Sequence, residues 1–289
     1  MMHLNVLKDI RKIYQSLDAD SIRGEAWRDL NVGMLALSDD GYRRMEAFLA
    51  PPSMETVGRE QALRSLHQAT ASTAARYDFV LCEPGIPVPR NGYLFESDES
   101  DSLCTLIVNE NSELELALAR TFPLFREVVS NKLILRTARE NAMFSLVTAL
   151  PNIVPNIVEL PWAVGEFATD TAFLTMNQIR MALRIAAGYG RPVGYKEQKL
   201  DIAAIVAGAF GWRAIARELV GKIPLGGGLI PKAAVAFAGT YVVGMGLEKV
   251  NRTGSGLSRQ EKREAYAMAF SRGKEVVREL APNIIHSES

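Results

Sequence analysis

The sequence has few of the residues from which metal centres and catalytic sites are usually built. Its 289 residues include two cysteines, Cys82 and Cys104, and three histidines, His3, His67 and His286. Two cysteines this far apart do not make a zinc knuckle or a disulfide framework. The histidines fall near the two ends of the chain and on one predicted surface helix, which is not the arrangement of a metal site or a catalytic triad. We therefore predict no metal-binding residue.

Motifs that would identify a reaction are also missing. The sequence has no G-x-x-x-x-G-K-[ST], H-E-x-x-H, C-x-x-C or G-x-S-x-G, which are the signatures of phosphate loops, zinc hydrolases, zinc or dithiol sites and serine hydrolases. Thirty-three basic residues balance thirty-three acidic ones, whereas a protein that grips nucleic acid usually has a basic excess. We predict no enzyme activity, no catalytic or cofactor-binding residue, no cofactor and no nucleic-acid partner.

A continuous apolar segment is lacking at the N-terminus. Residues 1–20 instead have the pattern of an amphipathic helix, with Leu4, Leu7 and Ile10 on one face. This helix would either pack on the protein's own core or lie on anionic lipid, and the sequence leaves both open. Because no signal peptide is indicated, we expect the protein to face the cytoplasm.

Residues 21–112 have the pattern of a small α/β domain with a partly parallel sheet. Ser38 is placed to cap a helix that Pro51 and Pro52 end. Cys82 and Cys104 both fall in apparent strands, where cysteine is usually a small buried residue. The predicted strands are 31–37, 79–82 and 103–108, and the predicted helices are 38–49 and 54–76.

The turn between the first strand and the first helix of this domain stands where a nucleotide-binding fold carries its phosphate loop. The turn has one glycine and no lysine, and it carries Asp39 and Asp40. Helix N-termini attract phosphate, but two carboxylates at that point repel it. We therefore expect a degenerate domain, similar in layout to a GTPase domain but without a working phosphate loop.

Residues 113–289 are predicted to be helical. Ser112 with Glu115, and Ser258 with Glu261, have the spacing of capping boxes at helix starts. Pro123 is expected to interrupt the first of these helices, and Pro282 to end the last. The further helices are predicted at 125–149 and 169–189.

An apolar helical hairpin is predicted at residues 200–249. Its second arm, 233–247, has fifteen residues without a charge, and Ala234 and Ala238 have the small-xxx-small spacing of closely packed helices. A membrane span needs about 20 apolar residues, and Arg213 and Arg217 would be costly at mid-bilayer. The hairpin is therefore either membrane-associated or buried in a soluble core, and it offers a surface for homo-oligomers.

Two groups of residues are candidate sites. The glycines 226–228 between two lysines resemble a phosphate cradle, but a flexible turn between helices is the commoner reason for such a triplet. An acidic site is conceivable at Glu159, Glu166 and Asp170. The commoner role of such carboxylates is a surface salt bridge, here with Arg180 or Arg184.

Glycine, proline and apolar residues recur in a distinctive pattern at Met176–Met181, Ala186–Gly190, Ile223–Pro231, Gly239-Thr240 and Gly244. With this pattern, residues 141–250 resemble the uncharacterised GTPase-associated domain family, found C-terminal to Era-like GTPases and in YcjF-type inner-membrane proteins. The resemblance implies a helical, often membrane-linked module that works beside a GTPase, and it supplies no catalytic residues.

Together these features predict a mostly α, or α+β, protein of three parts: an amphipathic helix at 1–20, a small α/β domain at 21–112 and a helical GTPase-associated-type domain at 113–289. We expect a non-enzymatic scaffold or regulatory protein on the cytoplasmic face of a bacterial inner membrane, with lipid, a GTPase in trans or a second copy as partner. The alternative is a soluble cytoplasmic module whose α/β domain binds a nucleotide or another small ligand.

Overall fold

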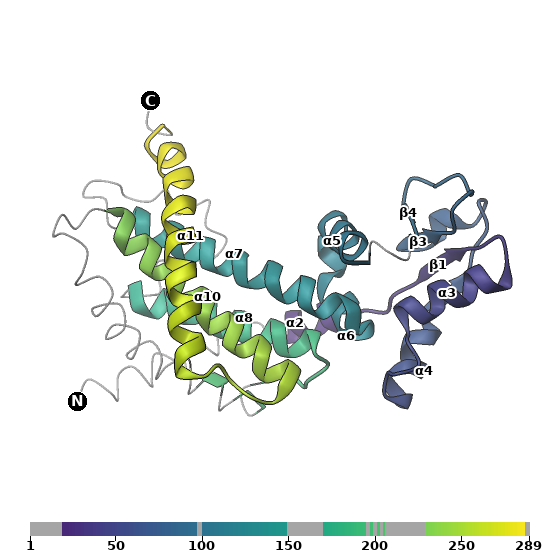
Figure 1. Cartoon of the computed structure of the whole chain (residues 1–289), viewed down its shortest axis with the longest axis horizontal. Coiled ribbons are helices and arrows are strands. Elements are labelled where there is room, and N and C mark those ends of the chain that lie inside the picture. The colour runs from purple at the N-terminus through teal and green to yellow at the C-terminus, as the bar shows by residue number, and fades with distance from the viewer. Residues whose placement is uncertain are drawn as a thin grey trace. The chain divides into compact units, whose positions relative to one another are not determined.

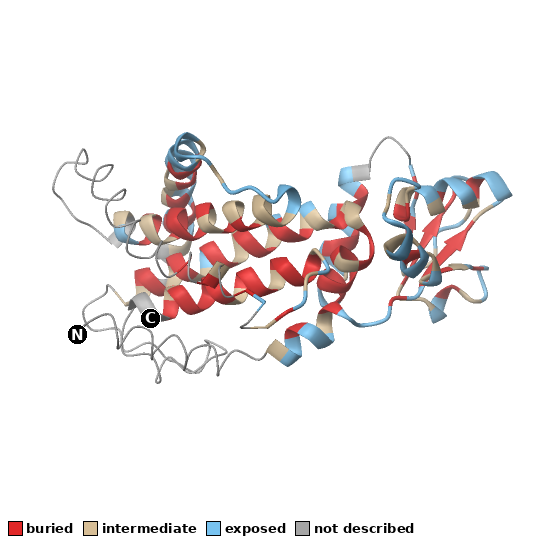
Figure 2. Cartoon of the chain, turned by 90° about the horizontal axis from the view of Figure 1, so that it is seen from below, coloured by how far each residue is buried: buried red, intermediate tan, exposed pale blue. Residues whose placement is uncertain are grey.

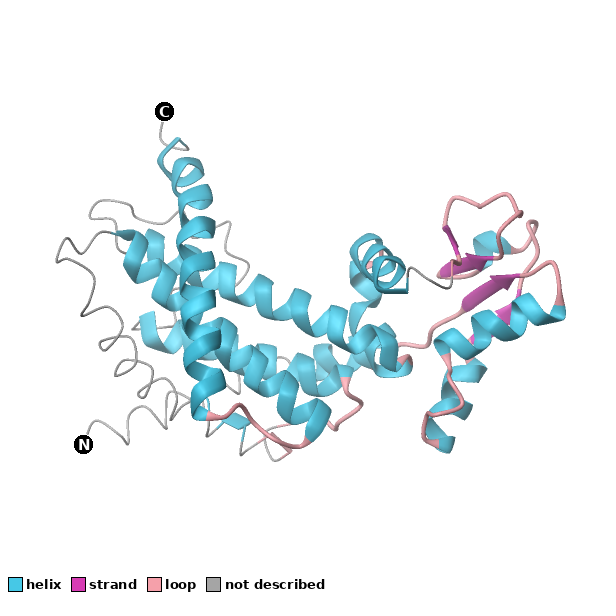
Figure 3. Cartoon of the chain, viewed as in Figure 1, coloured by secondary structure: helices cyan, strands magenta, loops and turns pink. Residues whose placement is uncertain are grey.

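The computed structural model describes residues 19–96, 100–148, 170–194, 197–198, 201–202, 205 and 229–286. Contacts between these residues divide them into two units. The α/β unit comprises Asp20–Ser130 and Ala187–Pro192, and the helical unit is drawn mainly from Asn131–Ala186 and Val193–Ser289. Figure 3 shows a mostly helical chain with one small sheet, which confirms the predicted fold class. The predicted domain limits stay a prediction, because a domain is defined by its ability to fold independently and not by contacts alone.

Four parallel strands form the sheet of the α/β unit, in the order β2-β1-β3-β4. Figure 1 labels β1, β3 and β4. Every residue of β1 and β3 is buried, as expected for the central strands of a parallel sheet. Gly33 of β1 is tightly surrounded, since an added Cβ would lie 2.7 Å from the ring of Tyr77. The strands are β1 Val32–Leu35, β2 Leu66–Gln68, β3 Phe79–Cys82 and β4 Gly92–Leu94.

The strand predicted at 103–108 is wrong, because this segment lies within helix α5, Ser100–Glu110. Its buried residues are Leu103, Cys104, Ile107 and Val108. That spacing repeats after four residues, as on one face of a helix, and does not alternate as in a strand. Cys104 is therefore buried in a helix rather than in a strand, and the fourth strand of the sheet is β4 instead.

The helix predicted at 54–76 is also wrong in part. Helix α4, Thr56–Arg64, ends early, and the short strand β2 and the 3-10 turn η1, Ala74–Arg76, follow it. Only the first residue of β2 is buried. The segment therefore lacks the run or alternation of apolar residues by which a strand is recognised in a sequence. Pairing with β1 makes this segment a strand, and such pairing is not visible in local sequence.

Two helices of the α/β unit show one confirmed and one failed cap. Helix α3, Asp39–Leu49, begins as predicted, with the Ser38 hydroxyl accepting the Gly41 amide at 3.0 Å. The capping box at Ser112 and Glu115 is wrong, because helix α6, Glu115–Thr121, has Leu114 at its N-cap and no side-chain cap. The turn η2, Ser112–Leu114, occupies the position expected for the cap.

Four long helices make up the described part of the helical unit, and Figure 2 shows buried residues along their facing sides. Helices α10 and α11 form an antiparallel pair. Their contact is close, since an added Cβ on Gly273 of α11 would lie 3.1 Å from the Ala234 carbonyl oxygen of α10. The core is mainly alanine and valine. The helices are α7 Arg126–Val147, α8 Asp170–Gly188, α10 Leu229–Thr253 and α11 Arg259–His286. Two further elements in the described part of the chain are α2 Ala19–Ala26 and η3 Pro123–Phe125.

The predicted capping box at the start of α11 is confirmed. The Ser258 amide donates to Glu261 Oε2 at 2.7 Å, and the Glu261 amide donates to the Ser258 hydroxyl at 3.2 Å. The predicted end at Pro282 is wrong, since α11 continues through it to His286. A proline so near the end removes one backbone donor and leaves most of a long helix unaffected.

Three predicted features lie outside the described residues. They are most of the N-terminal helix 1–20, most of the first hairpin arm and the glycine triplet 226–228. The second hairpin arm is described, and α10 contains all of it, as predicted.

Candidate functional site

The carboxylate of Glu83 lies at the N-terminus of α3, where a nucleotide-binding fold holds phosphate. Glu83 follows β3 directly, and its Oε2 accepts the Leu37 amide at 2.7 Å. Its Oε1 accepts a hydrogen bond from Arg44 Nη2 of α3 at 2.9 Å. The Glu83 side chain is only 12% exposed. A carboxylate of the chain itself therefore occupies the place beside the helix start where a nucleotide-binding fold would hold phosphate.

The helical unit contains a buried network of uncharged polar side chains that links α7, α8 and α10. Asn141 Nδ2 donates to Thr240 Oγ1 at 2.8 Å, and Asn177 Nδ2 donates to Asn141 Oδ1 at 2.8 Å. Gln178 Nε2 donates to the same Thr240 oxygen at 3.1 Å. All four residues are buried. Satisfied networks of this kind fix the register of helices, because a shift would leave donors unpaired in the core.

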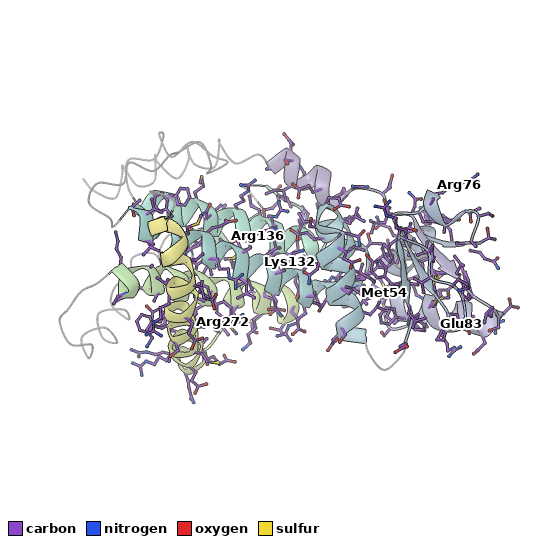
Figure 4. The ribbon with its side chains drawn as sticks, turned by 90° about the horizontal axis from the view of Figure 1, so that it is seen from above. Met54, Arg76, Glu83, Lys132, Arg136 and Arg272 are labelled. Carbon is purple, nitrogen blue, oxygen red and sulfur yellow. The ribbon has the colours of Figure 1, made fainter. Side chains whose placement is uncertain are left out.

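A cavity of about 310 Å³ opens beside this network, between α7 and α8. We call it the basic cavity, because three arginines line it. Arg180 and Arg184 stand one turn apart on α8, and Arg136 faces them from α7, where Figure 4 labels it. The lining residues are Leu133, Arg136, Thr137 and Glu140 of α7 and Asn177, Arg180, Met181 and Arg184 of α8.

Glu140 is the one acidic side chain among the described residues that line the basic cavity. Burial raises its pKa above the ordinary value, and the positive charges of the three arginines oppose that shift. The arginines themselves also make other interactions. A partly buried cluster of guanidinium groups with planar, multiple donors is suited to bind carboxylates and phosphates.

The side chains of the predicted acidic site lie outside the described residues. The sequence predicts that Glu159, Glu166 or Asp170 pairs with Arg180 or Arg184. The first two of these acids lie outside the described residues, and of Asp170 only the backbone is described. Glu140, which sequence reasoning did not select, faces both arginines electrostatically. Glu140 follows Arg136 by four residues on α7, just as Arg184 follows Arg180 by four residues on α8. This spacing, which places side chains on one helix face, is the sequence signal that could have identified Glu140.

The cysteines and the described histidine side chain form no reactive site. Cys82 and Cys104 are both buried thiols, and burial raises their pKa, that of Cys104 to about 12. A thiol with so high a pKa is a poor nucleophile and metal ligand. His67 stacks on Tyr77 with ring centroids 5.9 Å apart. Among the described residues, no group of three metal-binding side chains gathers.

Comparisons with family models, with curated proteins and with solved structures yield no match to this chain.

Proposed function

We propose that this protein is a non-enzymatic scaffold or regulatory protein that attaches to the cytoplasmic face of a bacterial inner membrane through its helical unit. The observation that carries the proposal is helix α10. Its segment Pro231–Thr253 is long and apolar enough to cross a membrane, although the core helix of a soluble protein passes the same test. The residues on the side of α10 that faces away from its neighbours therefore distinguish membrane contact from burial in a soluble core.

That outer face of α10 is apolar throughout its middle. Between Lys232 and Glu248 the helix has no charged residue. A surface helix of a soluble protein normally carries charged residues on the side opposite its core. Four partly buried positions of this stretch fall on one side of the helix and form this outer face: Val235, Ala236, Val243 and Gly246. Tyr241 and Met245 are also partly buried, but they pack against the core of the helical unit.

The polar group in the middle of α10 is also compatible with a low-dielectric environment. The hydroxyl of Thr240 accepts hydrogen bonds from Asn141 and Gln178, so α10 needs no water at that point. In contrast, α7 and α8 carry the charged residues of the basic cavity, and each would cost about 3 kcal/mol at mid-bilayer. These costs favour shallow, peripheral contact of the folded helical unit through the outer face of α10.

The α/β unit would then bind a partner protein. The resemblance to the GTPase-associated family favours a GTPase acting in trans, and the small residues of α10 favour contact with a second copy. The alternative, a soluble module whose α/β unit binds a nucleotide, has an observation against it, because the Glu83 carboxylate lies beside the start of α3, where it accepts the Leu37 amide and Arg44.

Flotation of the purified full chain with phospholipid vesicles tests membrane attachment through α10. We expect the chain to float with vesicles, and Val235→Glu with Val243→Glu to reduce the bound fraction severalfold, because two charges would enter the lipid-facing side. Met268→Glu, at an exposed position of α11, is the matched control and should leave flotation unchanged. The proposal is contradicted if the wild-type chain stays at the bottom of the gradient, or if all variants float equally.

A further inference from the structure

We propose that the basic cavity of the helical unit binds a small phosphate-bearing anion. This proposal does not depend on membrane attachment, because the cavity lies between α7 and α8 and uses no residue of the outer face of α10. The shared chemistry is a phosphate group held by guanidinium donors. It is met both by free phosphate or pyrophosphate and by the headgroup of an anionic phospholipid.

The first argument is the convergence of three arginines from two helices. Arg180 and Arg184 are four residues apart on α8, so their side chains leave the same face, and Arg136 meets them from α7. Each guanidinium group presents several N–H donors in one plane, a geometry that matches phosphate oxygens. Three such groups around one cavity can contact one anion from different sides.

The second argument is the rigidity of the two walls. The Asn177–Asn141 hydrogen bond of 2.8 Å joins α8 to α7 directly beside the cavity, and both residues are buried. The hydroxyl of Thr137 is tied back to the Leu133 carbonyl at 2.9 Å. The arginines are therefore mounted on helices whose spacing is already fixed, and binding need not pay for assembling the walls.

The third argument combines charge and size. The described lining residues carry three positive charges and one negative charge, from Glu140. Guanidinium groups in a partly buried place attract an anion more strongly than they would in bulk water. A cavity of about 310 Å³ is at the small end of ligand sites. It accommodates phosphate, pyrophosphate or a headgroup, and it is too small for a complete dinucleotide.

A purely structural ion-pair cluster is the competing interpretation, and it makes a different prediction. If Glu140 serves only to neutralise the arginines, substitutions would change stability and no anion would bind at this place. If the cavity is an anion site, the same substitutions would change the affinity for the anion.

The test is calorimetric titration of the purified full chain with inorganic pyrophosphate at constant ionic strength. We expect measurable binding, weakened about tenfold or more by Arg180→Gln or Arg184→Gln, because each change removes charge-assisted hydrogen bonds. Arg139→Gln, an exposed position of α7, removes the same charge outside the cavity and should leave affinity within about twofold. Arg184→Lys keeps the charge and the fold but should still weaken binding severalfold, because lysine lacks the fork of donors.

Vesicles distinguish the two sources of phosphate. If a phospholipid headgroup is the ligand, adding phosphatidylglycerol to phosphatidylcholine vesicles should increase flotation, and Arg184→Gln but not Arg139→Gln should abolish the increase. If free phosphate is the ligand, pyrophosphate should bind and flotation should not respond to Arg184→Gln. The proposal is overturned if neither probe responds to Arg180→Gln or Arg184→Gln, or if Arg139→Gln has the same effect as the cavity substitutions.

Discussion

Gly41 and Glu83 are packed so closely that a Cβ atom on Gly41 would lie 2.1 Å from Oε2 of Glu83. Gly41 belongs to the first turn of α3, and Glu83 follows β3, so this contact ties a helix start to the end of the central sheet. The absence of a side chain at residue 41 allows the carboxylate to reach the Leu37 amide.

Gly41→Ala is therefore expected to destabilise the α/β unit. The added methyl group would displace the Glu83 carboxylate from Leu37 and Arg44, and losing hydrogen bonds to a nearly buried charged group costs about 2 kcal/mol. Urea unfolding monitored by circular dichroism measures the change. Gly58→Ala in α4 is the control, because the nearest atom to its added Cβ is 3.8 Å away, and there alanine should stabilise slightly. Equal effects of the two substitutions would contradict the role assigned to Glu83.

Thr240→Val tests the buried polar network of the helical unit. Valine has nearly the same shape but accepts no hydrogen bond, so the amides of Asn141 and Gln178 would lose an acceptor inside the core. We expect a loss of about 2 kcal/mol in the free energy of unfolding, measured by chemical denaturation. Thr253→Val makes the same change at an exposed position of α10 and should cost far less. An unchanged stability of the Thr240 variant would show that the network contributes nothing.

Ser258→Ala tests the capping box that begins α11. The substitution removes the acceptor for the Glu261 amide, and losing an N-cap side chain costs about 1 kcal/mol. Thermal unfolding should show a lower midpoint temperature for Ser258→Ala than for the wild-type protein. Ser255→Ala, in the preceding loop, is the control and should leave the midpoint unchanged. The opposite order would mean that the loop, and not the cap, stabilises the start of α11.

The same capping box predicts a dependence of stability on pH. Hydrogen bonds from Lys249, and then from Ser258, lower the pKa of Glu261 to about 2 from its ordinary 4.5. A carboxyl group with a lowered folded-state pKa contributes stability above its ordinary pKa, and this is lost as the pH falls from about 4.5 towards 2. Glu261→Gln should remove that part of the acid sensitivity, as measured by unfolding at a series of pH values. Identical acid profiles for both proteins would contradict this expectation.

Glu140→Gln is expected to strengthen anion binding in the basic cavity. The substitution removes the negative charge that competes with a bound anion for the three arginines. Since burial raises the pKa of Glu140, the wild-type protein should likewise bind anions more tightly as the pH falls through that pKa. Sulfate is the suitable probe, because it stays fully ionised over this range. Titrations should show that Glu140→Gln binds sulfate more tightly at neutral pH and has lost the pH dependence. Weaker binding by the variant would mean that Glu140 organises the arginines instead of opposing the anion.

Local signals in the sequence were sufficient for much of the fold. The apolar runs of β1 and β3, the Ser38 cap of α3 and the long periodic segments of α7, α8 and α10 all depend on neighbouring residues, and the structure confirms them. The strands β2 and β4 have three residues each. They are strands because they pair with β1 and β3, and no local pattern reveals such pairing. The apolar run of α5 predicts a strand where the structure has a helix, because strands and short buried helices share that composition.

The candidate site was predictable only in its parts. The sequence identifies Arg180 and Arg184 as charged residues in an apolar helix and predicts acids near them in sequence as partners. In the structure they line one cavity with Arg136 and Glu140, about forty residues earlier in the chain. Such convergence depends on how α7 packs against α8, which one sequence does not specify.

Fractionation of cells that produce the full chain tests the central claim, membrane association, most directly. We predict that the protein sediments with membranes in neutral buffer and is released by an alkaline carbonate wash, because the charged residues on α7 and α8 keep the folded helical unit at the surface. Retention after the wash would support membrane association but contradict the shallow contact. Recovery in the soluble fraction from the outset would contradict membrane association.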